Sequence, residues 1–397
     1  MKQPLDRTLI YDRDVSGHHL DYLQFLVEYL KRMPESVRQQ YVFVLNEEAQ
    51  KRFANDQAEI RFHFIAAPQL AEFLQHTNVL RRAAAEMKFL KKLLDEYDAK
   101  RLIFMHIDAF QFELGRLSLR RKNIKLSGLM FLPFRKYYED DSTLSAVLRR
   151  EWRGWRKGMQ MRWMLRNRQI ERMFFLNDKQ GVEDYTKRFG PYFEYLPDPI
   201  ELRTFENTPL ETLRHKYSIP DGRKVFLIYG HLSSRKNIPN ILLALRRLTV
   251  SQREQLCILI SGEPEKGYET TLQTALSEAK LKCPEVMFVE HIRFFDPADT
   301  HDVFRIADVV LVPYINFFSS SNILGLAAKH NKPLIASKLG IMGVLVHQYQ
   351  LGTTVAPQSV REIAEAIQQH LGVTAEIDGQ KYLNDHTADE FSKKILF

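Results

Sequence analysis

The stretch ADVVLVPYINFFSSSNILGLAAKHNKPLIASKLGIMG, residues 307–343, decides the fold. The apolar, largely β-branched run at 309–312 predicts a short buried parallel strand, which Pro313 ends. A small polar run, Ser319, Ser320, Ser321 and Asn322, then precedes an apolar helix, and the next strand begins at 333. The free N–H groups and the dipole at a helix start favour an anion. The polar run is therefore either a phosphate-binding turn or an ordinary serine cap.

The same alternation extends through the whole second half of the chain. Short apolar runs separated by helical patterns predict a parallel sheet covered on both faces, with ligands at the carboxyl ends of the strands. The predicted strands are 225–230, 256–262, 286–290, 309–313, 333–337 and 353–356.

The first half repeats the pattern less regularly. We expect helices at 18–31 and 78–97, and we interpret the proline-broken run 193–200 as the start of a linker. The fold class is therefore α/β, with a first domain over 1–205, a second over 206–384, and a terminal helix over 385–397 capped by Thr387. The predicted strands of the first half are 8–12, 41–45, 61–65, 101–105, 127–132 and 173–177.

Composition indicates a globular protein without a disulfide framework. Of 397 residues, 45% are hydrophobic and 27% charged, and only two are cysteine. The N-terminal residues show no apolar segment typical of a signal peptide, and no apolar run is long enough to span a bilayer, so we expect a cytoplasmic protein. The net charge is +8, and residues 149–172 alone carry nine basic and two acidic residues, or 9 − 2 = +7. That concentration indicates a local partner surface.

A second polar loop follows the predicted strand 225–230. The strand ends at Gly230, whose bare backbone permits close approach of a ligand. The loop then presents His231, Ser234, Arg235 and Lys236 just before a helix. Two cations beside a helix start can neutralise a diphosphate, although a solvated basic loop has the same composition.

Taken together, GHLSSRKN, ISGEP, FVEHIRFF, DVFRIADVVLVPY and NKPLIAS resemble the retaining GT-B glycosyltransferases of the "glycosyl transferases group 1" kind, over about 205–371. The resemblance implies two Rossmann-like domains facing a cleft, with a C-terminal crossover helix that packs on the first domain. It also implies a nucleoside-diphosphate sugar as co-substrate, with no further cofactor and no metal.

The resemblance also implies a donor site. Gly230 and Lys236 match the family's motif, whereas His231 stands where the family has an arginine that Arg235 is placed to replace. The nucleotide and base fall near Gly262, His291 and Arg293, and the distal phosphate falls at Ser319, Ser320, Ser321 and Asn322, with Ser234 in the first loop.

One departure concerns two glutamates that the family places eight positions apart. Those positions hold Phe317 and Gly325 here. In the family, the second glutamate holds the donor ribose and the first lies near the transferred sugar. Gly325 inside a helix costs about 1 kcal/mol relative to alanine. Either a close contact with a ligand or another helix requires the glycine, or the glycine is tolerated without a specific role.

In the first domain, His106 ends a predicted strand, and the resemblance places a functional histidine there, near the acceptor and the transferred sugar. A satisfied histidine at a strand end is the alternative. Gly17 and His18, followed by His19, precede or begin the first helix and are candidates for donor contact. At most one of the two histidines need face the site, because neighbouring helical side chains diverge.

Residues 149–174 can be drawn as one helix that carries all three tryptophans. Trp152, Trp155 and Trp163 share a face in that drawing, and arginines such as Arg156 cover much of the rest. This composition suits an anionic membrane surface or a lipid-diphosphate acceptor. A helix packed by its tryptophans with a solvated arginine face, or a nucleic-acid surface, are the alternatives.

The leading hypothesis is a metal-independent, retaining glycosyltransferase with His106, Arg235 and Lys236 as its catalytic residues. It transfers a sugar to a glycan or lipid-linked acceptor in cell-surface polysaccharide assembly, and is peripheral on the inner face of the plasma membrane. The missing glutamates support a second hypothesis, a GT-B binding or scaffold protein with impaired catalysis. A membrane-surface or nucleic-acid binding protein using 149–172 is the third, with nucleic acid the less expected partner.

Overall fold

The computed structural model describes residues 6–15, 19–116, 123–131, 144–200, 205–373 and 376–397. The chain divides into two compact units, here called unit 1 and unit 2. Unit 1 comprises residues 1–199 together with the terminal segment Thr387–Phe397, and unit 2 comprises Ile200–His386.

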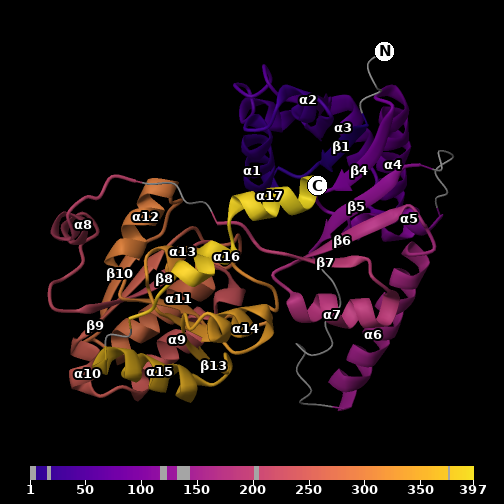
Figure 1. Cartoon of the computed structure of the whole chain (residues 1–397). Coiled ribbons are helices and arrows are strands. Elements are labelled where there is room, and N and C mark those ends of the chain that lie inside the picture. Colours follow the sequence, from indigo (N-terminus) through magenta and orange to yellow (C-terminus); the bar gives the residue numbers. More distant parts are fainter. Residues whose placement is uncertain (1–5, 16–18, 117–122, 132–143, 201–204, 374–375) are drawn as a thin grey trace. The chain divides into compact units, whose positions relative to one another are not determined.

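Unit 1 is built on a seven-stranded parallel sheet in the order β3-β2-β1-β4-β5-β6-β7 (Figure 1). Its strands are rich in β-branched and aromatic residues, as expected for strands buried on both faces. They are β1 (Arg7–Asp12), β2 (Tyr41–Asn46), β3 (Arg61–Ile65), β4 (Ala99–Phe104), β5 (Lys125–Met130), β6 (Ile170–Leu176) and β7 (Phe193–Leu196).

Side chains of β1 alternate between two hydrophobic cores. Leu9 and Tyr11 belong to one core and Ile10 to the other, which is the period of two that a doubly covered sheet requires. The helices of unit 1 are α1 (His19–Lys31), α2 (Glu35–Arg38), α3 (Ala67–Leu74), α4 (Val79–Glu96), α5 (Gln111–Arg116), α6 (Leu144–Met164), α7 (Lys179–Phe189) and α17 (Ala388–Leu396).

The terminal helix α17 packs on unit 1, where it lies against α1 (Figure 1). Phe391 and Ile395 are fully buried in the same core as Ile10. The Tyr41 hydroxyl and the Arg101 guanidinium each donate a 2.9 Å hydrogen bond to the Leu396 carbonyl, which satisfies an orphan carbonyl at the helix end. The Thr387 side chain accepts from the Glu390 N–H, so the predicted N-cap is confirmed.

Unit 2 is a six-stranded parallel sheet in the order β10-β9-β8-β11-β12-β13. This is the doubly wound Rossmann order. The first three strands are added toward one edge of the sheet, and the next three are added on the other side of the first strand, toward the opposite edge. Its strands are β8 (Lys224–Tyr229), β9 (Leu256–Ser261), β10 (Met287–His291), β11 (Val309–Val312), β12 (Leu334–Ser337) and β13 (Gly352–Val355). Its helices are α8 (Leu210–Lys216), α9 (Ile238–Ala244), α10 (Val250–Glu254), α11 (Glu269–Lys282), α12 (Pro297–Ile306), α13 (Ile323–Lys329), α14 (Gly340–Gln348), α15 (Val360–Gly372) and α16 (Gln380–Asp385).

Two sequence-based expectations are wrong. Residues 193–196 are β7, the edge strand next to β6, rather than the start of a linker, because the prolines at 197 and 199 lie beyond the paired residues. The helix drawn from 149 to 174 ends at Met164, and Ile170 and Phe174 lie in β6. Burial on both faces of a parallel strand gives an apolar run that helical periodicity can also fit.

Two glycines bring the loops after β8 and β9 into contact. Gly230 has φ +94° and Gly262 has φ +144°, which side-chain-bearing residues rarely adopt. A Cβ on Gly262 would lie 2.0 Å from the Gly230 carbonyl oxygen, so neither the space nor the backbone conformation admits a side chain.

We expect Gly262→Ala to lower the free energy of unfolding by on the order of 3 kcal/mol, because it combines backbone strain with a backbone clash. Gly372→Ala is the matched control, since no atom lies within 4 Å of the Cβ it would add at the end of α15. It should change stability by less than about 1 kcal/mol. Urea unfolding of both variants measures the difference, and equal stabilities would contradict the close approach.

Candidate active site

The predicted donor loops of unit 2 meet at the topological switch point of its sheet. β8 and β11 are neighbours, and Gly230 directly follows the first while Tyr314 follows the second by two residues. In open parallel sheets, ligands bind at the carboxyl ends of the two strands where the order reverses. Residues 230–236 and 313–322 therefore occupy the place where a ligand is expected.

Lys236 is a buried cation without a carboxylate partner among the described residues of the chain. It is 2% exposed, and its ammonium donates to the Tyr229 carbonyl and, at 2.9 Å, to the Tyr314 hydroxyl. Burial and the neighbouring Arg235 lower the pKa of Lys236 to about 7. An added anion would stabilise the charged form, because it supplies the opposite charge that the protein does not.

Gly230 leaves the approach to this ammonium bare. A Cβ built on Gly230 would lie 3.5 Å from Lys236 Nζ, so a larger residue would stand against the charge. The glycine therefore allows a ligand to come close to both the backbone and the ammonium.

Arg235 is a second cation held beside the first. Its guanidinium carbon lies 4.6 Å from the ring centroid of Phe317 and 5.3 Å from that of Tyr314, and the two rings meet edge to face. Its carbonyl accepts from the Ile315 N–H at 3.0 Å. The arginine is fixed by aromatic faces, and none of the described carboxylates pairs with it, so its charge remains available to a phosphate.

The Tyr314 hydroxyl connects the two predicted loops. It accepts from Lys236 and also hydrogen-bonds the side chain of Ser321, while burial raises its pKa well above the ordinary value. Asn322 is the N-cap residue of α13 but makes no side-chain cap bond, and α13 is only seven residues long. The structure thus brings Ser321 to Lys236 through one tyrosine, and the side chain of Asn322 does not cap α13.

Phe317 and Gly325, the two positions at which the resemblance predicts glutamates, both make close packing contacts. Phe317 stacks on Arg235, as described above. Gly325 is buried, and a Cβ there would lie 2.7 Å from Ile200 Cγ1 and 2.8 Å from its Cδ1. The glycine is therefore required by the close contact of Ile200, whose N–H is fixed by a 3.0 Å bond to the His386 carbonyl.

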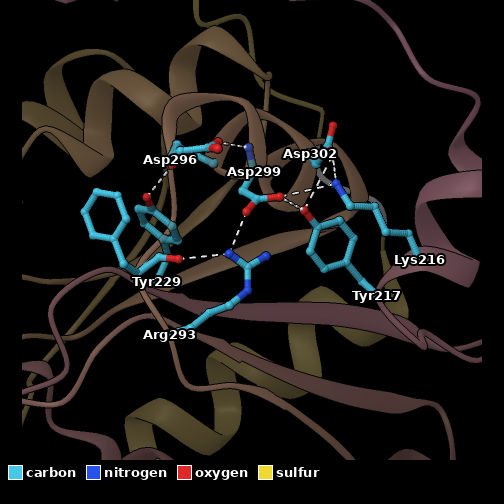
Figure 2. Close-up of polar contacts among 9 residues, drawn as sticks. Lys216, Tyr217, Tyr229, Arg293, Asp296, Asp299 and Asp302 are labelled. Atoms are coloured by element: carbon cyan, nitrogen blue, oxygen red, sulfur yellow. Dashed lines mark hydrogen bonds and ion pairs between the residues drawn. The ribbon is translucent and has the colours of Figure 1, made fainter.

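The other predicted donor residues fall into two groups. His231 and Ser234 are exposed on the loop after β8. Arg293 and His291 instead take part in a polar network with α8 and α12. Figure 2 shows Asp299 between Arg293 on one side and Lys216 and Tyr217 on the other.

Asp299 accepts from Arg293 at 2.6 Å, from Tyr217 at 2.8 Å and from Lys216 at 3.2 Å. Its pKa falls to about 2, chiefly through the Arg293 hydrogen bond. His291 Nε2 lies 3.1 Å from the Tyr217 carbonyl. Arg293 is thus neutralised by a carboxylate, in contrast to Arg235 and Lys236, which makes those two the stronger phosphate candidates. Sequence reasoning missed this network because α8 and α12 are 80 residues apart.

Unit 1 gathers charged groups at its own switch point. His106 follows β4, and its ring lies 3.4 Å from Asp108 Oδ2 and 3.7 Å from Asp14 Oδ2. Burial lowers its pKa, but the hydrogen bonds to Asp108 and Asp14 outweigh burial and raise it to about 9. Gly17 and His18 lie outside the described residues. His19, the first residue of α1, pairs with Asp12 and stands 6.0 Å from His106, ring to ring. The signal available in the sequence was Asp-x-Asp after one strand and His-x-Asp after its neighbour.

The three tryptophans of α6 differ in their exposure to solvent. Trp163 packs on α5, where its indole N–H donates to the Phe112 carbonyl at 3.1 Å and its ring fills the space beside Gly115. Trp152 and Trp155 are 59% and 61% exposed. Arg156, Trp163 and Phe112 help to line a hollow of about 420 Å³. In the part of the chain that the structure describes, no helix is long and apolar enough to cross a bilayer.

Comparisons with known proteins give one family match and several structures of similar fold. Residues 210–373 match the family model described as glycosyl transferases group 1. No curated protein sequence matches the chain significantly. Three similar structures are the N-terminal domain of trehalose-6-phosphate phosphatase from Candida albicans (TM-score 0.69, 12% identity, 98% of this chain and 96% of that chain), sucrose-phosphate synthase from Thermosynechococcus elongatus (0.68, 16%, 98% and 96%), and HepE from Anabaena in complex with UDP (0.66, 14%, 98% and 98%).

Two parallel-sheet Rossmann-like units and the terminal helix on the first define the GT-B fold, which these similar structures share. The match to the glycosyl transferases group 1 model lies within unit 2 and spans 164 residues of that unit.

The packing around Gly325 predicts that a glutamate introduced at this position would clash with Ile200. We expect Gly325→Glu to destabilise the protein by about 1–3 kcal/mol, because the new side chain overpacks against Ile200. In an Ile200→Ala background the same change should cost less, and urea unfolding of the four proteins in this double-mutant cycle measures the coupling. Strict additivity would show that Ile200 does not exclude the side chain.

Proposed function

We propose that this enzyme transfers a sugar from a nucleoside-diphosphate sugar, with its donor diphosphate bound between residues 230–236 and 319–322 of unit 2. The observation that carries the proposal is the buried ammonium of Lys236, which has no carboxylate partner among the described residues and lies behind the bare backbone of Gly230. Arg235 supplies a second charge, which rests on the Phe317 ring and has no carboxylate partner in the part of the chain that the structure describes. HepE, which shares the fold, binds UDP, so UDP is the first nucleotide to test.

In the proposed reaction, an acceptor hydroxyl forms a bond to the anomeric carbon as the bond from that carbon to the diphosphate oxygen breaks. The hydroxyl proton leaves with the nucleoside diphosphate. Lys236 and Arg235 stabilise the charge that develops on the departing diphosphate, which is electrostatic catalysis by preorganised cations. Transfer proceeds with retention and without a required metal ion, and the anomeric configuration of the first-formed product by NMR tests the stereochemistry.

His106 contacts the transferred sugar or the acceptor in this proposal. The filled positions at Phe317 and Gly325 favour one alternative, a binding protein with impaired catalysis, because two carboxylates of the family are replaced by packing. Binding of UDP with neither transfer nor hydrolysis of any UDP-sugar would favour that alternative.

We expect Lys236→Met to weaken UDP binding by roughly 30- to 100-fold, since it removes a charge-assisted hydrogen bond at nearly constant volume. Lys381→Met, which removes an exposed lysine on α16, is the matched control and should bind as the unaltered chain does. Calorimetric titration with UDP measures both. Equal affinity in the two variants would refute the role of Lys236.

The affinity for UDP should also fall as the pH rises from 7 to 9. Lys236 has a pKa of about 7 in the free protein, so above that pH binding must first restore a proton. Lys236→Arg keeps its charge and should show a flatter profile. An unchanged slope in Lys236→Arg would assign the pH dependence to another group.

We further propose that the enzyme works at an anionic membrane surface on the cytoplasmic side, in cell-surface polysaccharide assembly with a glycan or lipid-linked acceptor. The α6 surface, defined here as Leu148, Trp152, Trp155, Arg156 and Met159, supports this. All five side chains are exposed, and the Arg156 guanidinium lies 5.2 Å from the Trp152 ring. Aromatic rings at the headgroup level with arginine on lipid phosphates are typical of interfacial helices.

Trp152→Ser combined with Trp155→Ser should reduce binding to vesicles of anionic phospholipid at least tenfold. Arg156→Glu should reduce it about fivefold or more and lessen its salt dependence. Arg361→Glu, an exposed arginine on α15, serves as the control. Vesicle co-sedimentation gives the affinities. Undiminished binding by the tryptophan variant, or tighter binding to DNA than to vesicles, would contradict a membrane role.

A further inference from the structure

Unit 1 places two acidic and histidine-bearing turns side by side. β1 and β4 are adjacent parallel strands, with Tyr11 paired to Phe104, so the residues that follow them meet at one edge of the sheet. Asp12 ends β1, and Asp14 and His19 follow it in the chain. His106 follows β4 by two residues.

Three side chains in this cluster point ligand atoms at one another. One oxygen of Asp14 and one ring nitrogen each of His19 and His106 all lie within 4.8 Å of one another. A zinc ion bound at about 2.0–2.2 Å holds its ligand atoms about 3–3.5 Å apart. The ligand atoms must therefore approach one another by up to about 1–2 Å to hold the ion.

Each histidine is oriented by a further carboxylate. His19 Nδ1 lies 2.7 Å from Asp12 Oδ2, whose side chain is 2% exposed, so the Nε2 of His19 is the nitrogen left for a ligand. On His106, Nε2 faces Asp108 Oδ2 at 3.4 Å, and Nδ1 faces Asp14. Asp108 is itself fixed, because Oδ2 accepts from the Phe131 N–H at 2.8 Å. Metal-bound histidines in proteins characteristically show such carboxylate partners on the opposite ring nitrogen.

We propose that Asp14, His19 and His106 form a binding site for a divalent transition metal of the zinc class, with Asp12 and Asp108 orienting the two histidines. Two imidazoles and one carboxylate favour Zn²⁺, Co²⁺ or Ni²⁺ over Mg²⁺ and Ca²⁺, which prefer oxygen ligands alone. Three protein ligands leave a fourth position for water or a ligand oxygen.

The carboxylates make this place favourable for a positive charge, whether a proton on His106 or a metal between the ligands. The site stands on these contacts alone and does not require the donor site of unit 2. Only one consequence rests on the proposed function. A metal that engages His106 withdraws it from the sugar or acceptor, so zinc should inhibit a transfer that needs no metal.

Titration of the full chain with Co²⁺ tests the site directly. We expect one Co²⁺ per chain with the intense visible bands of a four-coordinate ion, and displacement of these bands by Zn²⁺ but not by a large excess of Mg²⁺. His19→Ala should weaken Zn²⁺ binding at least about 100-fold, and Asp12→Asn, which removes only an orienting group, about 10-fold.

Asp14→Asn is the second ligand variant, chosen because it keeps the size of a half-exposed side chain and should leave folding intact. His215→Ala removes an exposed histidine of α8 and is the control, which should bind metal as the unaltered chain does. Thermal unfolding of each variant confirms that it is folded. The proposal is overturned if the unaltered chain binds no Co²⁺ at one equivalent, or if the folded Asp14 and His19 variants bind as tightly as His215→Ala. Loss of UDP binding has no bearing on this result, because it reports on unit 2.

Discussion

The arrangement of the proposed donor site depends on a buried ammonium that the protein solvates with neutral oxygens. Lys236 is held by the Tyr229 carbonyl and the Tyr314 hydroxyl, and Arg235 beside it is held by aromatic faces. Burying a cation in this way is unfavourable unless an anion completes the site. Neighbouring features are consistent with that need. Gly230 keeps side chains away from the charge, and Tyr314 ties the loop after β8 to Ser321.

Two other cations of unit 2 are paired with a carboxylate. Arg293 and Lys216 share Asp299, and the carboxylate pKa is lowered accordingly. These groups lie in one network that fixes α8 and α12 to the end of the sheet (Figure 2). The contrast between paired and unpaired cations, rather than the number of basic residues, distinguishes the phosphate candidates from the structural ones.

Packing explains the residues found at the two positions where the resemblance predicts glutamates. The Phe317 ring packs against the Arg235 guanidinium, and the side chain of Ile200 occupies the space that a side chain at Gly325 would need. Ile200 is the first residue of unit 2, and its backbone bonds to His386, the last. Gly325 therefore packs against the residue at which the first and last residues of unit 2 are hydrogen-bonded to each other. Charge stabilisation in the proposed transfer then falls to Lys236, Arg235 and backbone groups.

The sequence by itself determined the two parallel sheets, the terminal helix and the two polar loops that follow β8 and β11. Strands such as β8 and β11 are continuous apolar runs, and their ends are marked by Gly230 and Pro313, so local patterns sufficed. Only the tertiary structure decided which side chains meet. Asp12, Asp14, His19 and His106 are up to 94 positions apart, and α8 meets α12 across 80 positions. It also separated Trp163, which packs on α5, from the exposed Trp155, and it ended α6 at Met164. The physical reason is that periodicity reports which face of an element is apolar, whereas partners and charges are set by neighbours distant in the chain.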